Sequence, residues 1–202
     1  MTELLRDLPS PGNYEIQTDE SRGSRVKLFA PHGGCIEPCT GALVREIAAG
    51  RTDWYVFHGT CRHSCYGTLH VTSTHYDEPR CLRMAERAEV AVALHGCAGD
   101  DRFVEVGGGN APAVASLLEL LQEREFPVRP APDARQGGDA RNFVNLSRRR
   151  GVQLELSAGF RRSLFADYPR TAHPHPRAVR RLVRTMREWI ASLEADLADT
   201  PT

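Results

Sequence analysis

The chain has 202 residues, of which 41% are hydrophobic and 26% are charged, and its formal net charge is zero. These values are typical of a soluble globular protein that is large enough to bury a core of its own. Without a net positive charge there is no overall field that would attract nucleic acid or an anionic membrane, so we expect neither as a partner.

The first 24 residues are polar and contain proline, glycine and serine, which predicts an N-terminal arm with little regular structure. A single domain is predicted over residues 25–202. The chain shows neither the pattern of a signal peptide nor an apolar run of the ~18 residues that span a membrane. We therefore expect a cytoplasmic protein whose six cysteines are reduced.

Short apolar runs alternate with helical patterns along the rest of the chain. Strands are predicted at residues 26–30, 54–57, 68–73, 90–94, 103–106 and 152–156, and helices at 38–49, 79–88, 111–125 and 176–197. Residues 127–141 form a polar loop whose length is usually a sign of function or mobility. The alternation predicts a three-layer α/β domain with a central sheet flanked by helices.

Ionisable residues lie where several of the predicted strands end. His32, His75 and His95 follow three of these strands, and Glu155 lies late in a fourth. In open α/β sheets, binding sites gather at the carboxyl ends of the strands. We therefore expect these four side chains to border one site.

Three of the residues near these strand ends suit a catalytic zinc ion. Such a zinc ion has three histidine or carboxylate ligands and keeps one position for water, and His32, Glu37 and His95 could provide this set. Gly33 and Gly34 would let the chain between the first two ligands fold back toward one point. Zinc would lower the pKa of its water to roughly 7 and so make a nucleophile at neutral pH.

A hydrolase of this kind also needs a carboxylate that moves the proton of the water. Glu155, flanked by Leu154 and Leu156 in the predicted strand, is our candidate for this general acid/base. A strand with one solvated face would produce the same alternation of polar and apolar residues, so the pattern alone does not distinguish the two interpretations.

Four segments carry a resemblance to a known family: APHGGCIEPCT (30–40), LHVTSTHYDEPR (69–80), VALHGC (92–97) and GVQLELSAGFR (151–161). They resemble the poly-γ-glutamate hydrolases, phage and bacterial zinc peptidases that cleave γ-glutamyl bonds and are related in fold to zinc carboxypeptidases. The resemblance spans most of residues 14–165. It implies a mixed sheet with helices on both faces.

The resemblance also implies roles for individual residues. It places one zinc ion on His32, Glu37 and His95 and makes Glu155 the general acid/base. It further implies that His75 acts near the site, either by binding substrate or by polarising the carbonyl that is attacked. The histidines at positions 58, 63 and 70 are interpreted as structural or exposed.

A γ-glutamyl substrate carries free α-carboxylates, so its enzyme should offer arginine or asparagine donors near the metal. Members of the family tend to have Asn-x-x-Asn-Arg before the glutamate strand. Here Asn142 and Asn145 match this pattern, but Leu146 stands in the place of the arginine. Arg161 is our predicted carboxylate binder, and a solvated surface arginine is the alternative interpretation.

The sequence thus predicts a zinc-dependent hydrolase of amide bonds, with γ-glutamyl linkages as the favoured substrate. One alternative is a zinc amidase or deacylase that acts on a small N-acyl or γ-glutamyl metabolite or biosynthetic intermediate. The other is a non-catalytic binding protein on the same fold. Retention of Glu155 beside the three ligands favours an enzyme, because a binding protein has no need of a general base.

Overall fold

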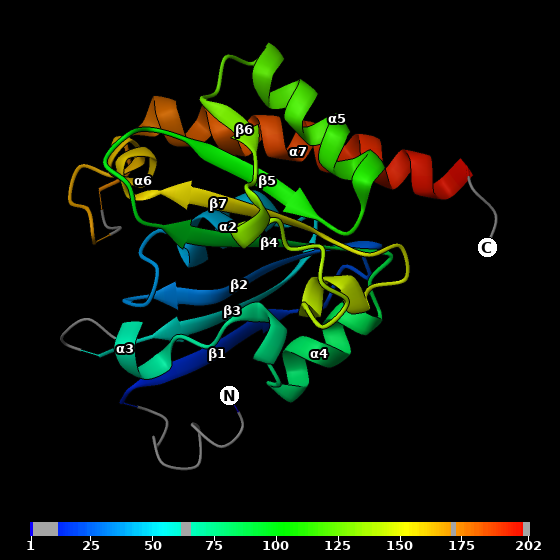
Figure 1. The fold of residues 1–202 in the computed structure, drawn as a ribbon, viewed down its shortest axis with the longest axis horizontal. Helices are drawn as coiled ribbons and strands as arrows, with labels where there is room; N and C mark the ends of the chain where they lie inside the picture. Colours follow the sequence, from blue (N-terminus) through cyan, green and yellow to red (C-terminus); the bar gives the residue numbers. More distant parts are fainter. Residues whose placement is uncertain (2–11, 62–65, 171–172, 200–202) are drawn as a thin grey trace.

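The computed structural model describes Met1 and residues 12–61, 66–170 and 173–199. Its strands are β1 (Tyr14–Asp19), β2 (Val26–Gly34), β3 (Asp53–Gly59), β4 (Val90–Cys97), β5 (Val104–Gly108), β6 (Val128–Pro130) and β7 (Val152–Ser157) (Figure 1). Its α-helices are α2 (Thr40–Ala48), α3 (Tyr66–Leu69), α4 (Pro79–Glu86), α5 (Ala111–Glu123), α6 (Ala158–Leu164) and α7 (Pro176–Asp199). Three short 3₁₀ helices complete the described elements: η1 (Ser73–His75), η2 (Asp133–Arg135) and η3 (Phe143–Leu146).

The strands form one mixed sheet in the order β1-β3-β2-β4-β7-β5-β6, which confirms the predicted fold class. The four central strands β3, β2, β4 and β7 are parallel, whereas β1 pairs antiparallel with β3 and β5 pairs antiparallel with β7. The chain passes from β2 to β3 on one side and later returns to β4 on the other side of β2. A reversal of this kind opens a crevice at the carboxyl ends of the two strands.

Alternate residues of the central strands contribute to two separate cores, which makes the domain three-layered. On β4, Val90, Val92 and Leu94 pack in the core that includes α2, α5, α6 and α7. Ala91 and Ala93, which lie between them in the sequence, pack in a second core with residues of α4 and η3. A strand buried on both faces is apolar at nearly every position, and the run VAVAL shows this pattern.

The N-terminal arm predicted over residues 1–24 is wrong for residues 14–19, which form the edge strand β1. The ring of Tyr14 stacks on Phe57 at 5.0 Å between centroids, and this contact helps hold the strand against β3. The other residues of β1 are mostly polar and partly exposed, so the apolar signal of a strand is weak there. Residues 2–11 of the predicted arm lie outside the described part of the chain.

The strand predicted at residues 68–73 is also wrong. Helix α3 ends at Leu69 and a loop leads into η1. The threonines and Val71 favour a strand by propensity, but these residues pair with none of the described strands of the sheet. Leu69 is instead buried in the second core, and the loop passes over the carboxyl ends of the strands.

Two further elements depart from the predicted pattern. Helix α6, directly after β7, is absent from the prediction, and it begins where the hydroxyl of Ser157 accepts a hydrogen bond from the backbone of Phe160. The polar loop predicted at residues 127–141 contains the short strand β6 and the turn η2. Within the described residues, none of the helices combines the length and the apolar character that crossing a membrane requires.

Candidate functional site

The end of β2 places two ionisable side chains at the same point. His32 is the seventh residue of β2 and is buried. After two glycines the chain turns back, and the backbone N–H of Glu37 donates to the carbonyl oxygen of His32 at 2.8 Å. Gly34 adopts a positive φ of 69° at the start of this turn. The buried Glu37 carboxylate is thereby brought back beside the ring of His32.

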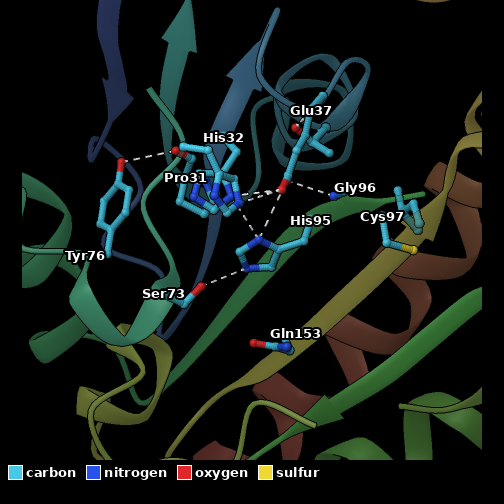
Figure 2. A network of polar contacts seen from close by, with 12 residues as sticks. Pro31, His32, Glu37, Ser73, Tyr76, His95, Gly96, Cys97 and Gln153 are labelled. Atoms are coloured by element: carbon cyan, nitrogen blue, oxygen red, sulfur yellow. Dashed lines mark hydrogen bonds and ion pairs between the residues drawn. The ribbon is translucent and has the colours of Figure 1, made fainter. Parts of the chain in front are cut away.

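His95, near the end of the neighbouring strand β4, completes a compact cluster. Nδ1 of His32 lies 3.2 Å from Oε1 of Glu37, and Nδ1 of His95 lies 3.7 Å from Oε2 of the same carboxylate. The two Nδ1 atoms are 3.3 Å apart. Figure 2 shows these three side chains, which come from β2, the following loop and β4, pointing toward one another.

The hydrogen bonds on the outer side of both rings orient the histidines toward the cluster. Nε2 of His32 lies 2.8 Å from the carbonyl oxygen of Val71, and because a carbonyl only accepts, this nitrogen carries the proton. The Nδ1 lone pair of His32 therefore faces the cluster. Nε2 of His95 lies 3.4 Å from Oγ of Ser73. Outer hydrogen bonds of this kind are usual for histidines that bind metals.

The donor set fits a zinc ion. The two Nδ1 atoms lie 3.3 Å apart; that of His32 is 3.2 Å from Oε1 of Glu37, and that of His95 is 3.7 Å from the other oxygen, Oε2. Ligands about 2.0–2.1 Å from a tetrahedral zinc ion lie about 3.3 Å from one another. Two imidazole nitrogens and a carboxylate at this range have room for a cation, either a metal ion or a proton carried by one of the rings. The structure thus supports the predicted kind of site, and the assignment of the three ligands stays a prediction.

His70 also belongs to this cluster, which the sequence did not indicate. Its Nε2 lies 3.4 Å from Oε1 of Glu37, and atoms of His32, Glu37 and His70 lie within 4.8 Å of one another. The ring of His70 lies between two others: it stacks on Tyr66 at 4.3 Å between centroids and is tilted by 34° against His32 at 4.2 Å. The structure therefore brings His70 into a group of side chains that could hold a metal ion, a position that its interpretation as structural or exposed did not anticipate. Its place in the segment LHVTSTHYDEPR was the one available signal.

The electrostatics of the cluster keep its donors ready for a cation. Burial favours the protonated form of Glu37, but the surrounding histidines, His32 first, outweigh it and lower the pKa of this carboxyl. Burial lowers the pKa of His95 to about 4, so its imidazole is neutral at pH 7. An ionised carboxylate and a neutral imidazole are the forms that bind zinc.

Glu155 borders the same site from the next strand. It is the register partner of His95 in the parallel pairing of β4 with β7. Burial, with the charge of Glu37 adding to it, raises the pKa of Glu155 to about 8. The side chain is only partly exposed and lines a cavity with His32, Glu37 and His95. The alternation in this strand therefore reflects a cavity, rather than a solvated face.

The cavity has a volume of about 1170 Å³. It is bordered by the histidine cluster, by Glu155, and by the loop from Asp133 to Asp139. His75 lines it as well, but its side chain is exposed and its Nδ1 lies 3.0 Å from Oγ1 of Thr72. The predicted catalytic role of His75 stays a prediction.

Arg161 lies at the cavity but is buried and tied to the backbone. Its guanidinium donates to the carbonyl oxygens of Leu156 at 3.0 Å, Pro38 at 3.0 Å and Cys97 at 2.9 Å. Pro38 follows Glu37 and Cys97 lies near His95, so Arg161 joins the segments that carry two proposed ligands. Gly96 leaves room for it, since a Cβ there would lie 2.6 Å from Cζ of Arg161. Carboxylate binding by Arg161 stays a prediction.

Asn142 and Asn145 hold the loop beside the cavity. Nδ2 of Asn142 donates to the side-chain oxygen of Gln153 at 2.8 Å. Nδ2 of Asn145 donates to the carbonyl oxygens of Gly137 at 2.8 Å and Asp139 at 2.7 Å. Asn142 lines the cavity and is buried. Their contacts are those of positioning residues, and direct substrate binding by either one stays a prediction.

The expected reduced state of the cysteines is wrong for two of them. Cys35, in the loop between His32 and Glu37, and Cys61 each take part in a disulfide bond. Cys39, Cys81 and Cys97 are free thiols. Cys65 lies outside the described residues. Disulfides persist in oxidising compartments and are rare in the cytoplasm, so the disulfide-bonded Cys35 and Cys61 do not fit the cytoplasmic location that we expected.

Residues 1–188 of the chain match the model of a known protein family, "Poly-gamma-glutamate hydrolase". The chain belongs to this family. Among its relatives is the UPF0714 protein YndL of Bacillus subtilis (strain 168), which is 38% identical over 171 residues, or 82% of this chain. The aligned part is 66% of YndL, so the chain spans slightly less than two thirds of that relative.

Two solved structures of the family resemble this one closely. The zinc-free structure YNDL-apo matches with a TM-score of 0.88 and 33% identity, and a bacteriophage poly-gamma-glutamate hydrolase matches with a TM-score of 0.88 and 27% identity. In both cases 96% of each chain is covered. An N-formylglutamate amidohydrolase from Ralstonia eutropha matches with a TM-score of 0.59 at 11% identity over 91% of this chain and 99% of its own, which concerns the fold alone.

Proposed function

We propose that this member of the poly-γ-glutamate hydrolase family is a zinc-dependent hydrolase of amide bonds that acts on γ-glutamyl linkages. The observation that carries the proposal is the convergence of His32, Glu37 and His95 beside Glu155 in one cavity. Family membership supports the choice of a γ-glutamyl substrate. One zinc ion on the three residues would supply Lewis-acid activation of water and of the substrate carbonyl.

Glu155 would move the proton. As a carboxylate it accepts a proton from the attacking water, and it then donates that proton to the leaving nitrogen. Its raised pKa of about 8 suits the second step, because a carboxyl group with this pKa readily holds a proton near neutral pH. A cation beside Glu37 would neutralise the charge that adds to the raised pKa, and would so favour the ionised form needed for the first step.

His70 would assist at the carbonyl oxygen. Its ring is held between Tyr66 and His32 and is 19% exposed, so one edge of it faces the cavity. A donor fixed near the position of the developing oxyanion stabilises the transition state more than the substrate. His75, at the exposed rim, is the alternative candidate for this task.

The test measures zinc content by elemental analysis together with amine release from γ-glutamyl oligomers. We expect about one zinc ion per chain, and a loss of activity in Glu155→Gln with the zinc retained. Glu119→Gln, at an exposed position on α5, is the matched control and should behave as wild type. A protein that holds no zinc when prepared without chelators would contradict the metal site.

The same experiment separates the alternatives. If the protein holds zinc and releases amine from small N-acyl compounds but not from γ-glutamyl oligomers, it is an amidase or deacylase of small metabolites. A binding protein on the same fold would hold zinc and bind its ligand tightly without hydrolysing any amide. Its affinity for the ligand would be the same in Glu155→Gln.

A further inference from the structure

On β5, Glu105 anchors two arginines at the edge of the cavity. Its carboxylate is only 1% exposed and pairs with both Arg129 and Arg135. Arg135 donates from Nε to Oε2 at 2.7 Å and from Nη2 to Oε1 at 3.0 Å. Arg129 donates from Nε at 3.0 Å and from Nη2 at 2.7 Å to the same Oε1. Two guanidinium groups on one carboxylate leave one positive charge that Glu105 does not neutralise.

The two arginines differ in what else they face. Arg129 lies over the ring of Phe103, with Cζ 3.9 Å from the centroid, and does not border the cavity. Arg135 borders the cavity together with Glu155. Glu105 and Glu155 are register partners on the antiparallel strands β5 and β7, so they belong to the same face of the sheet. The charge that Glu105 does not neutralise is therefore presented to the cavity by Arg135, beside the proposed acid/base.

The guanidinium of Arg135 keeps one edge available. Glu105 occupies the edge formed by Nε and Nη2. The Nη1 amino group has no hydrogen-bond partner among the residues that the structure describes. Nη1 and the outer N–H of Nη2 together form the second edge of the fork, which matches a carboxylate bidentately.

The loop that carries Arg135 is fixed in place before any ligand binds. Nε2 of Gln153, a buried residue of β7, donates to the carbonyl oxygen of Arg135 at 2.8 Å. The backbone N–H of Gly108 donates to the carbonyl oxygen of Gln136 at 2.7 Å. Nδ2 of Asn145 donates a hydrogen bond to the carbonyl oxygen of the next residue, Gly137, at 2.8 Å. A receptor held in this way loses little conformational entropy on binding.

We propose that Arg135 binds the substrate carboxylate attached to the carbon next to the scissile nitrogen. The proposal rests on the proposed function, because it assumes that Glu155 protonates the leaving nitrogen. In a γ-linked glutamate chain this carbon carries the free α-carboxylate of the leaving residue. A cation beside the acid/base is placed to hold that group, whereas the α-carboxylate on the acyl side lies several bonds away from the nitrogen.

The binding test uses protein with the Glu155→Gln substitution, so that no turnover intervenes. Two probes are titrated by calorimetry: γ-glutamyl-glutamate, and the same dipeptide with the α-carboxylate of its second residue replaced by a carboxamide. We expect the carboxylate probe to bind more tightly. Adding Arg135→Met should weaken the carboxylate probe by roughly 10- to 100-fold and should leave the carboxamide probe nearly unchanged, because only the charged hydrogen bonds are lost.

Arg129→Met is the matched control, since it removes the other guanidinium from the same Glu105. It should leave the preference for the carboxylate probe intact. Arg135→Lys, which keeps the charge but not the fork, should retain part of the preference. Circular dichroism and thermal unfolding of each variant establish that it is folded.

Equal weakening of both probes by Arg135→Met, or the same loss in Arg129→Met, would overturn the role of Arg135. The binding result is independent of hydrolysis. If γ-glutamyl oligomers are not cleaved by the protein with intact Glu155, and the Arg135-dependent preference is nonetheless present, the proposed reaction fails while the carboxylate site stands.

Discussion

At the scale of single residues, the position of a ring in the site counts for more than its place in the sequence. His70 and His75 lie in the same segment, and both line the cavity. His70 lies between two rings and contacts Glu37, whereas the side chain of His75 is exposed. A fixed donor needs no reorganisation as charge develops in the transition state, but an exposed one remains solvated.

We therefore expect His70→Phe, which keeps an aromatic ring but has no donor, to lower kcat/KM for γ-glutamyl oligomers by at least about 100-fold, the usual cost of losing a donor to the oxyanion. His75→Asn should change it little. Steady-state kinetics of both variants, with their zinc contents measured in parallel, would separate a loss of catalysis from a loss of metal. A larger loss in His75→Asn would reverse the assignment.

At the scale of secondary-structure elements, the end of β2 depends on the close approach of two backbones. Gly34 has a φ of 69°, and a Cβ at this position would lie 2.1 Å from the carbonyl oxygen of Gly59 on β3. Gly50, in the turn after α2, has a φ of 70°, but no atom of the described residues lies within 4 Å of such a Cβ. The two glycines therefore share a left-handed backbone conformation, but only at Gly34 would an added Cβ clash with the neighbouring strand.

Gly50→Ala should cost roughly 1–2 kcal/mol of the free energy of unfolding, the penalty of a left-handed alanine. Gly34→Ala should cost clearly more, because its Cβ also forces β2 and β3 apart. It should also weaken zinc binding, since His32 and Glu37 flank the displaced turn. Urea denaturation and zinc titration of the two variants measure these effects. If both variants lose the same free energy of unfolding, the backbone around Gly34 accommodates the added Cβ without further cost.

The elements that the sequence predicted best are those buried on both faces. The run VAVAL in β4 and the apolar start of β2 are strands in the structure because two cores need them. Strand β1 was missed because an edge strand buries only part of its side chains. Residues 68–73 have the composition of a strand, yet they pair with none of the strands that the structure describes.

The same contrast applies to the site. His32, Glu37 and His95 could be proposed from sequence because they follow or interrupt strands that are strongly apolar. His70 and Arg135 could not, since each comes from an irregular segment whose path is set by distant contacts. The carbonyl of Val71 meets His32, and the carbonyl of Arg135 meets Gln153. Contacts between residues far apart in the sequence leave no pattern in the local sequence from which they could be predicted.

At the scale of the whole molecule, one face of the sheet changes character along its width. On the side of β2 and β3 it packs apolar rings against α4 and η3. On the side of β7 and β5 it carries Gln153, Glu155 and Glu105, which alternate with core residues of the opposite face. The loop from Asp133 to Asp139 borders the cavity there. The domain thus keeps ionisable groups inside its fold at a cost to stability.

The raised pKa of Glu155 makes this cost dependent on pH. The value is about 8 in the folded protein against an ordinary 4.5, so the folded protein holds this proton more tightly than the unfolded chain does. Below pH 4.5 Glu155 is protonated in both the folded and the unfolded protein, and its proton contributes fully to the free energy of unfolding. As the pH rises toward 8 the unfolded chain releases the proton first, so the free energy of unfolding falls, and above about 8 the loss is complete.

Glu155→Gln removes this titration, because an amide does not ionise. We expect the zinc-free wild type to lose stability relative to the variant as the pH rises from 5 toward about 8, and the difference to level off above that value. Urea denaturation of both proteins across this range measures it, with Glu119→Gln as the exposed control that should follow wild type. Parallel profiles for wild type and Glu155→Gln would mean that Glu155 keeps its ordinary pKa. Zinc should reduce the difference, since a cation in the cluster favours the carboxylate.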